Sequence, residues 1–242
     1  FFLVVCVAEG AGFAYGDRTA ERAHMVRTQI EARGLQDPRV LEAMRNVRRH
    51  LFVPAKSRRS AYGDYPLSIG YDQTISQPYI VAVMTELLHP QPNDKVLEVG
   101  TGSGYQAAVL SRLVDKVVTI EIIEPLGERS RALLTELGYD NVKVLTGDGY
   151  NGLPEEAPYD AIIVTAAPER VPEPLLEQLK VGGRMVIPVG GFYQELKVIV
   201  RTSEGFETKK VFPVRFVPMT GEVQNKLSNR RRHYEYLNGI EF

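Results

Sequence analysis

The sequence has few of the residues on which disulfides and metal sites depend. Cys6 is the only cysteine, so no intrachain disulfide can form and no Cys/His cluster is available for zinc. The histidines are scattered along the chain: His24, His50, His89 and His233. Each is expected to be a surface or packing residue, and no metal ion is expected.

The chain also lacks an excess of charge of either sign. Its 242 residues include 29 Lys and Arg and 30 Asp and Glu, for a formal net charge of −1. Nucleic-acid-binding domains usually present clustered Lys and Arg, so no nucleic acid is expected as a partner. The arginine run at 230–232 is expected to be solvated. A hydrophobic fraction of 44% in a chain of this length fits one or at most two domains.

Long hydrophobic runs are absent as well. Residues 1–8 are apolar but too short to span a membrane, and no stable membrane association is expected. Residues 12–14, Gly-Phe-Ala, have the small-x-small pattern of a signal-peptidase site. We expect a cytoplasmic protein, with export as the alternative if residues 1–14 are the remnant of a signal peptide.

The most informative feature that is present is a glycine-rich loop at 100–104. An apolar strand that ends at Val99 runs into Gly100, Gly102 and Gly104, and a helical run follows from Gln106. Glycines allow tight turns and a close approach of the backbone to a ligand, and the following helix N-terminus favours phosphate-like or nucleotide ligands. The loop therefore predicts a nucleotide-derived cofactor.

The spacing of these glycines bears on which cofactor binds. The dinucleotide fingerprint requires a third small residue where this chain has Tyr105. A register that starts at Gly102 places Ala107 third, but it begins two residues into the loop. Glu98 completes a Glu-x-Gly-x-Gly-x-Gly pattern that resembles motif I of S-adenosylmethionine-dependent methyltransferases. An NAD-linked oxidoreductase and a non-catalytic S-adenosylmethionine-binding module are the alternatives.

Three further apolar segments, at 117–120, 141–145 and 161–165, are predicted strands. The first ends at Glu121, at the distance where an acidic side chain meets a ribose in doubly wound folds, although a strand-end charge is the plain interpretation. The second precedes Gly147-Asp148-Gly149, where Asp148 can accept from an adenine amino group or simply form a turn. Strands at 184–189, 196–201 and about 212–216 are predicted to complete the sheet, with glycine pairs at 182–183 and 190–191 marking turns.

Two amphipathic helices are predicted before the nucleotide fold. The first covers about 18–33 and stops at Gly34, and the second covers 38–47, with Asp37 as its cap and Pro38 at its first position. Residues 61–82 follow as a segment dense in Gly, Pro, hydroxyl and amide groups. In it, Thr74 or Ser76 is predicted to cap a helix that begins at Pro78, a position also suited to an anionic substrate.

Several segments together resemble the bacterial protein-L-isoaspartate O-methyltransferases, over about 18–221. The segments that carry the resemblance lie at 66–70, 73–79 (Gln-Thr-Ile-Ser-Gln-Pro-Tyr), 84–88, 98–106, 147–150, 157–168 and 213–218. The segment at 73–79 is more specific than the glycine loop. Two departures are visible, Ser68 where the family usually has Pro and Asp72 where it usually has Gly. Asp72 adds a carboxylate beside the substrate loop, which bears on affinity for an anionic substrate.

The resemblance implies a doubly wound α/β class I methyltransferase fold and the repair of isoaspartyl-containing proteins and peptides with S-adenosylmethionine as methyl donor. The expected methyltransferase domain covers 61–221 and includes a substrate loop at 61–79. The residue patterns place a signal-like or disordered arm at 1–17 and a helical subdomain at 18–60 before it, and a tail at 222–242 after it. The implied catalytic residue is Ser76. The implied cofactor-binding residues are Glu98, Gly100, Thr101, Gly102, Ser103, Gly104, Gln106, Glu121, Asp148 and Gly149. The implied substrate-binding residues are Thr74, Ile75, Gln77, Val214, Arg215 and Phe216.

Overall fold

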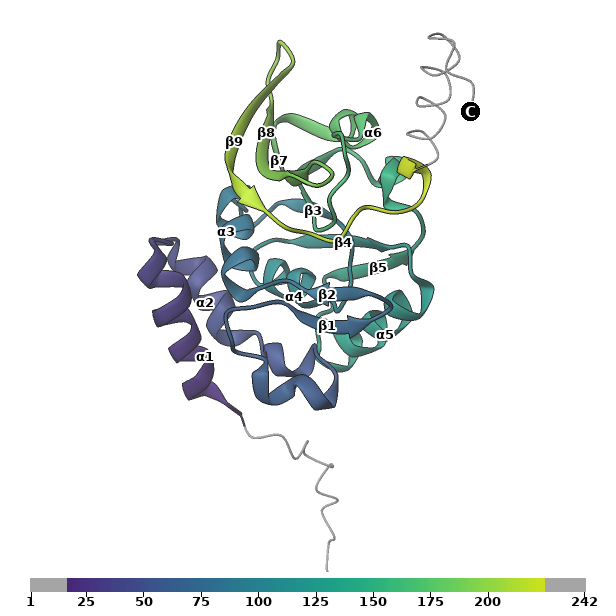
Figure 1. The fold of residues 1–242 in the computed structure, drawn as a ribbon. Coiled ribbons are helices and arrows are strands. Elements are labelled where there is room, and N and C mark those ends of the chain that lie inside the picture. Colours follow the sequence, from purple (N-terminus) through teal and green to yellow (C-terminus); the bar gives the residue numbers. More distant parts are fainter. Residues whose placement is uncertain (1–16, 225–242) are drawn as a thin grey trace, which may run out of the picture.

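A seven-stranded sheet runs through the centre of the molecule (Figure 1). The computed structural model describes residues 17–224. The strands are β3 (Lys95–Val99), β4 (Lys116–Glu121), β5 (Val142–Thr146), β6 (Tyr159–Val164), β7 (Leu179–Val189), β8 (Gln194–Arg201) and β9 (Phe206–Val214). Their order is β5-β4-β3-β6-β7-β8-β9, parallel from β5 to β7 and antiparallel from β7 to β9. Strands β3, β4 and β5 are added toward one edge of the sheet, and β6 and β7 are added on the other side of β3. This change in strand order between β3 and β6 confirms the predicted doubly wound fold.

The central parallel strands β3, β4 and β6 are mostly apolar because both of their faces are buried. In β6, Ala161 and Ile163 belong to one hydrophobic core, whereas Ile162 and Val164 belong to a second. Side chains alternate across a strand, so the two cores lie on opposite faces of the sheet. The first core is covered by α2 (Pro38–Asn46), α3 (Pro78–Leu88), α4 (Tyr105–Ser111) and α5 (Glu124–Glu136). The second is covered by the short α6 (Glu173–Glu177), by the 3-10 turn at Gly149–Asn151, by Leu153 and Ala157 on either side of the turn Pro154–Glu156, and by Met219 and Val223.

Two details of the sheet differ from the sequence prediction. The strand predicted at 184–189 begins earlier, and Gly182-Gly183 lie inside β7, where the pairing with β6 shifts register. The strand predicted at 212–216 is β9, which covers 206–214 instead. Its first five residues are exposed, since β9 is an edge strand. It therefore shows little of the hydrophobic alternation by which strands are predicted.

The predicted N-terminal helices are present, with one change in the first. It is an α-helix only over α1 (Thr19–Met25), and it continues as a π-helical turn (Val26–Ile30) and a 3-10 turn (Glu31–Arg33) before Gly34, whose φ is 93°. The second helix, α2, is capped by the Asp37 side chain, which accepts from the Arg39 amide at 2.8 Å. Residues such as Met25 and Met44 belong to the same core as Val96 of the sheet. The N-terminal helices therefore complete the core of the sheet.

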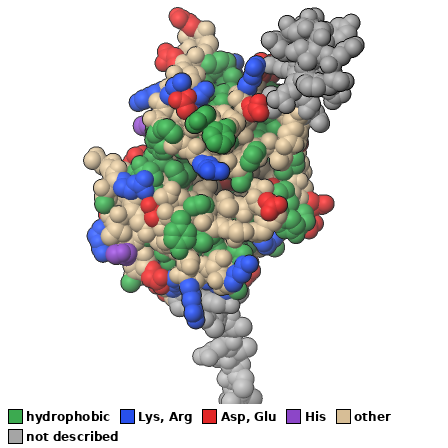
Figure 2. Space-filling view, viewed as in Figure 1, with side chains coloured by type: hydrophobic (Ala, Val, Ile, Leu, Met, Phe, Trp, Pro, Cys, Tyr) green, Lys and Arg blue, Asp and Glu red, His purple; other side chains and the backbone are tan. Residues whose placement is uncertain are grey.

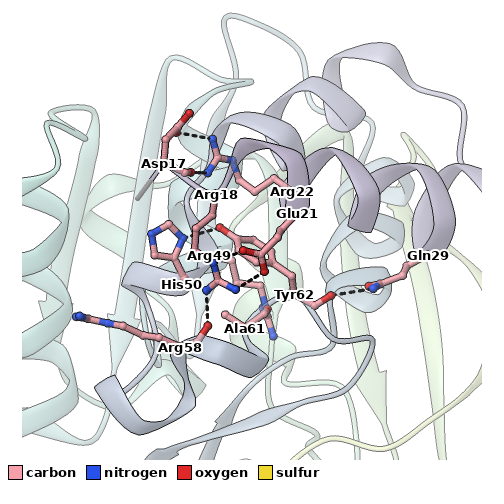
Figure 3. A network of polar contacts seen from close by, with 10 residues as sticks. All are labelled: Asp17, Arg18, Glu21, Arg22, Gln29, Arg49, His50, Arg58, Ala61 and Tyr62. Atoms are coloured by element: carbon pink, nitrogen blue, oxygen red, sulfur yellow. Dashed lines mark hydrogen bonds and ion pairs between the residues drawn. The ribbon is translucent and has the colours of Figure 1, made fainter. Parts of the chain in front are cut away.

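A buried polar network joins these helices to residues 55–62 (Figure 3). The Arg49 Nε donates to the Ala61 carbonyl at 2.8 Å, and the His50 Nδ1 and the Tyr62 hydroxyl are hydrogen bonded at 2.6 Å. Gln29 donates to the Tyr62 carbonyl at 2.8 Å. Burial, with nearby arginines, lowers the pKa of His50 to about 4, so its ring is neutral at pH 7. The network fixes the start of the polar segment that leads to the hairpin described below.

No helix within residues 17–224 has the length and apolar character needed to cross a bilayer. The expectations for residues 1–14, for Cys6 and for the arginine run at 230–232 fall outside the described residues.

Candidate active site

A cleft opens at the carboxyl ends of β3, β4 and β6, where doubly wound folds bind their ligands. It encloses about 630 Å³, part of which is open to solvent. Its walls come from segments that lie far apart in the sequence. They are Gln73, Thr74, Val99, Gly100, Gly102, Ile120, Glu121, Ile122, Ile123, Asp148, Gly149, Tyr150, Thr165, Ala166, Val217, Pro218, Met219 and Thr220.

The glycine loop forms the floor of this cleft. Gly100, Gly102 and Gly104 have φ values of 98°, 53° and 83°, a backbone region that favours glycine. At Gly100 a Cβ atom would lie 2.5 Å from the Thr165 hydroxyl oxygen. That hydroxyl donates back to the Gly100 carbonyl at 2.6 Å. A side chain at Gly100 would therefore both strain the backbone and displace the end of β6.

Glu121 is the last residue of β4 and holds the loop from the side. Its two carboxylate oxygens accept from the Gly102 amide at 2.7 Å and from the Ile123 amide at 2.9 Å. The side chain is nearly buried yet lines the cleft. A carboxylate fixed by two backbone amides still has lone pairs for a ligand hydroxyl.

Glu98 lies below the loop and does not line the cleft. It is fully buried between Thr119 and Ile163 of the neighbouring strands, and its oxygens have no well-aligned hydrogen-bond partner among the described residues. Burial raises the pKa of Glu98 to about 8, against a smaller lowering by Thr119. The carboxyl group is therefore neutral at pH 7.

Four other residues predicted to bind cofactor also lie behind the cleft wall: Thr101, Ser103, Gly104 and Gln106. The Thr101 hydroxyl is hydrogen bonded to that of Thr119 at 2.7 Å. The Gln106 amide donates to the Thr85 hydroxyl of α3 at 2.9 Å. In this structure these side chains connect the loop to the core.

Asp148 and Gly149 line the opposite wall, after β5. The Asp148 carboxylate accepts from the Tyr150 amide at 2.9 Å and from the Glu222 amide at 2.6 Å. Asp148 therefore joins the wall of the cleft to the segment that ends the described chain.

A two-stranded hairpin, β1 (Leu67–Gly70) and β2 (Gln73–Ile75), brings the polar segment to the cleft (Figure 1). At its tip, Tyr71 and Asp72 have φ values of 53° and 56°. The Arg129 side chain of α5 donates to the Ile69 carbonyl at 2.9 Å and ties the hairpin to the sheet domain. Of the predicted substrate residues in this segment, Thr74 lines the cleft, whereas Ile75 is buried in the core.

The predicted cap of α3 is wrong. The N-cap residue is Gln77, and no side chain caps the helix. Thr74 is paired with Ser68 in the hairpin, and Ser76 precedes the cap position. Pro78 at the first helical position already lacks an amide hydrogen that would need a partner. Ser76 is partly exposed, and it lies two residues after the cleft-lining Thr74.

The segment after β9 closes the cleft from above. Ala167 donates to the Val217 carbonyl and accepts from the Met219 amide, both at 2.8 Å. This places residues 217–220 along the cleft. Val214, Arg215 and Phe216 precede that stretch and do not line it.

Several cleft residues were missed on the sequence. Ile122, Thr165 and Ala166 directly follow strands β4 and β6, so the rule that ligands meet the carboxyl ends of parallel strands would find them. Tyr150 and residues 217–220 were not named as site residues, although they lie in segments that carry the family resemblance, at 147–150 and 213–220; they enter the cleft through tertiary contacts.

Comparison with known proteins decides between the alternatives that the glycine loop left open. A model of the protein-L-isoaspartate(D-aspartate) O-methyltransferase family matches residues 20–224. The chain belongs to this family. The methyltransferase is 55% identical over 206 residues to the protein-L-isoaspartate O-methyltransferase of Methanoregula boonei, which covers 85% of this chain and 95% of the relative. It is 53% identical over 209 residues to that of a Picosynechococcus strain, with 86% and 94% covered.

Solved structures support the same assignment. A protein-L-isoaspartate O-methyltransferase structure matches with a TM-score of 0.80 and 30% identity, covering 87% of this chain and 69% of the other. A Plasmodium falciparum protein described as such a methyltransferase, in complex with S-adenosyl-L-homocysteine, matches with a TM-score of 0.72 and 25% identity over 82% and 98% of the two chains. The family and the class I methyltransferase fold implied by the motifs are thus confirmed.

Proposed function

We propose that this methyltransferase repairs aged proteins by methylating the free α-carboxylate of L-isoaspartyl residues, with S-adenosylmethionine as the methyl donor. The observation that carries the proposal is the family match over residues 20–224, combined with a cleft at the switch point of the sheet. The expected product ester closes to a succinimide without further catalysis, and the succinimide opens in part to a normal aspartyl residue.

The cleft fits the methyl donor. It lies at the carboxyl ends of the parallel strands and is lined by both apolar and polar side chains, as small-molecule sites are. A Cβ at Gly100 would collide with the cleft-lining Thr165 hydroxyl, so glycine is needed to keep the floor of the cradle in this shape. Glu121 offers a carboxylate to the two ribose hydroxyls, and Asp148 offers one toward the adenine amino group, while Gly102 and Gly149 let the backbone approach.

The remaining predicted cofactor residues support this cradle from behind. We propose that Glu98, Thr101, Ser103, Gly104 and Gln106 act by holding the loop in shape. Their burial and the hydrogen bonds of Thr101 and Gln106 to the core support this indirect role.

The reaction demands little acid–base chemistry from the protein. Bound S-adenosylmethionine supplies a methyl group activated by its sulfonium. A carboxylate oxygen of the substrate forms a bond to the methyl carbon as the carbon–sulfur bond breaks, and the bonding electrons stay on sulfur. A carboxylate with a pKa near 4 is already ionised at neutral pH, so no general base is required. The protein's contribution is alignment and exclusion of water, which supply roughly 7–11 kcal/mol in favourable cases.

Ser76 is the proposed catalytic residue on the acceptor side. Its hydroxyl would donate to one oxygen of the substrate carboxylate and direct the other toward the methyl group. Its partial exposure, and its position two residues after the cleft-lining Thr74, support this role. Thr74, Ile75 and Gln77 are proposed to shape the same segment.

The segment after β9 is the proposed site for the substrate backbone. Val214, Arg215 and Phe216 were predicted for this role, and residues 217–220 extend the segment into the cleft. An extended substrate chain along this segment would place its reacting carboxylate between the hairpin and the glycine loop.

The test is methyl transfer to a matched pair of peptides that differ only in one isoaspartyl or aspartyl residue. With labelled S-adenosylmethionine, we expect label on the isoaspartyl peptide alone. Label on neither peptide would refute the proposed function, and equal label on both would refute its substrate class.

Two finer expectations accompany the proposal. We propose that the enzyme acts in the cytoplasm and that its macromolecular partners are damaged polypeptides rather than nucleic acid. The near-neutral charge of −1 supports the second point. Fractionation of native cells and a nucleic-acid binding titration test them.

A further inference from the structure

Two aromatic side chains stand almost fully exposed beside the cleft. Phe192 and Tyr193 form the turn between β7 and β8 and are 91% and 86% exposed. Their rings pack edge to face, with centroids 5.0 Å apart and an interplanar angle of 84°. Large exposed aromatic pairs of this kind are uncommon on a soluble surface without a partner, whereas aromatic residues are enriched where proteins bind other chains.

Hydrogen bonds hold this turn against the walls of the cleft. The Gly190 amide donates to the Pro168 carbonyl at 2.9 Å, two residues after cleft-lining Ala166. The Gln194 side chain accepts from the Phe216 amide at 2.6 Å and donates to the Phe216 carbonyl at 3.1 Å, one residue before cleft-lining Val217. The turn is thus attached on both sides to segments that line the cleft.

The shape of the turn is specified by glycine. Gly190 has a φ of 136°, and a Cβ there would approach the Tyr193 carbonyl oxygen to 1.9 Å. Only glycine permits the close return of the chain that projects the two rings outward. Figure 2 shows hydrophobic side chains exposed on this face, over the region where Figure 1 places the β7–β8 turn.

We propose that Phe192 and Tyr193 form a docking surface for an apolar or aromatic side chain of the substrate polypeptide that flanks the isoaspartyl residue. The inference rests on the proposed function, because that function requires a polypeptide to enter the cleft. An extended chain advances about 3.3–3.6 Å per residue, so residues two or three positions from the reacting one reach well beyond the cleft mouth. The surface is continuous with the segment at 213–220, along which the substrate backbone is proposed to lie. The enzyme therefore prefers damaged sites with apolar neighbours, such as those exposed when a core segment unfolds.

The experiment compares isoaspartyl peptides that carry Phe or Ser at each of the three positions on either side of the reacting residue. For the wild type, we expect Phe to raise kcat/KM about tenfold over Ser at one or more positions, mainly through KM. In the double variant Phe192→Ala/Tyr193→Ala, kcat/KM for the Phe peptide should fall to that of the Ser peptide. The Kd of the double variant for S-adenosylhomocysteine should stay within twofold of the wild-type Kd. This control shows that the double substitution leaves the cleft intact.

Phe206→Ala is the matched control. Phe206 is also an exposed aromatic residue, but it pairs with Arg201 at the opposite end of β8 from Gln194. It should retain the preference for the Phe peptide.

Three results would overturn the inference. Equal kcat/KM for all peptides in the wild type would overturn it while the proposed function stands. Methylation of no peptide would overturn the proposed function and the inference with it. A dimer in sedimentation that the double substitution dissociates would assign the aromatic pair to a second copy of the chain.

Discussion

The two sides of the cleft are built differently. On the donor side, the glycine loop and Glu121 are almost buried and are connected by hydrogen bonds to the core strands. On the acceptor side, the hairpin tip and Arg215 are exposed and Ser76 is half-buried, whereas hydrogen bonds to Ala167 and Gln194 hold residues 216–219. The donor side is preorganised throughout, and the acceptor side is preorganised only in part.

This difference matches what each side must bind. The methyl donor is the same molecule in every turnover, so a rigid site that fits only this molecule can serve every reaction. The acceptor is any damaged polypeptide, so the cleft itself must recognise what all such substrates share, namely the displaced carboxylate and the backbone, while the exposed pair Phe192 and Tyr193 outside the cleft adds a preference among flanking side chains. The division predicts that substitutions on one side leave the function of the other side intact.

The largest effect is expected at Ser76. Ser76→Ala should lower kcat on an isoaspartyl peptide by about 10²- to 10³-fold, the usual loss when one positioned hydrogen-bond donor is removed. Because Ser76 belongs to the acceptor side, the calorimetric Kd for S-adenosylhomocysteine should change less than twofold. Ser68→Ala, an exposed serine on the other strand of the same hairpin, is the control and should keep its kcat within twofold. Unchanged turnover in Ser76→Ala would remove Ser76 from the mechanism.

The next effect concerns stability beneath the donor side. Glu98 has a pKa of about 8 in the folded protein against an ordinary value of 4.5, so the folded state binds more protons than the unfolded state between these values. Stability from this group is complete below about pH 4.5 and is lost as the pH rises through about 8. Glu98→Gln has no carboxyl group to titrate, so it does not lose stability as the pH rises. Relative to the wild type, its free energy of unfolding should be higher by roughly 3 kcal/mol at pH 7 and by far less at pH 5.

Urea denaturation of Glu98→Gln across this pH range makes the measurement. Glu207→Gln, an exposed residue of β9, should show no such trend. A gain for Glu98→Gln that is the same at pH 5 and pH 8 would show that Glu98 is ionised in the folded protein.

Glu121 should affect the donor alone. Glu121→Gln replaces a charged acceptor of two backbone amides by an amide with one acceptor oxygen, and hydrogen bonds to charged groups contribute about 1.5–3 kcal/mol. The Kd for S-adenosylhomocysteine should rise about 10- to 30-fold, while KM for the peptide changes less than threefold. Glu124→Gln, three residues further and exposed, is the control. A change in peptide KM as large as the change in Kd would argue against separate roles.

The smallest effect is expected at the hairpin tip. Asp72→Asn removes a carboxylate and keeps a residue that tolerates the left-handed backbone at φ 56°. For an isoaspartyl peptide with acidic neighbours, KM should fall about two- to threefold at low salt, the size of a surface charge effect. The difference should vanish near 1 M salt because the charges are screened. Asp140→Asn, on an exposed turn before β5, should leave KM unchanged.

The sequence allowed the donor side to be predicted far better than the acceptor side. Alternating glycines, buried strands and an acidic residue at a strand end are local patterns, and they placed Gly100, Gly102 and Glu121 correctly in the cleft. The sequence could not show whether Thr101 and Gln106 contact the ligand or support the loop, because a motif does not tell which side chains face the ligand. In the structure they point to the core.

The acceptor side depends on contacts between distant segments. Residues 217–220 reach the cleft because they pair with Ala167, and only the family resemblance of the stretch at 213–220, not a local pattern of hydrophobicity, pointed to them. The edge strand β9 was predicted at the wrong residues because its exposed positions do not alternate between apolar and polar side chains. The absence of a side-chain cap on α3 follows from the pairing of Thr74 with Ser68, which depends on the hairpin.

The division of the cleft is tested most directly by a double-mutant cycle with Ser76→Ala and Glu121→Gln. The quantity to measure is the rate of methyl transfer to an isoaspartyl peptide with both substrates well below saturation. Independent sides predict that the two losses multiply, with the double variant within about twofold of their product. A double variant no slower than Ser76→Ala alone would show that the two residues act as one unit, and it would contradict the separation of donor and acceptor sides.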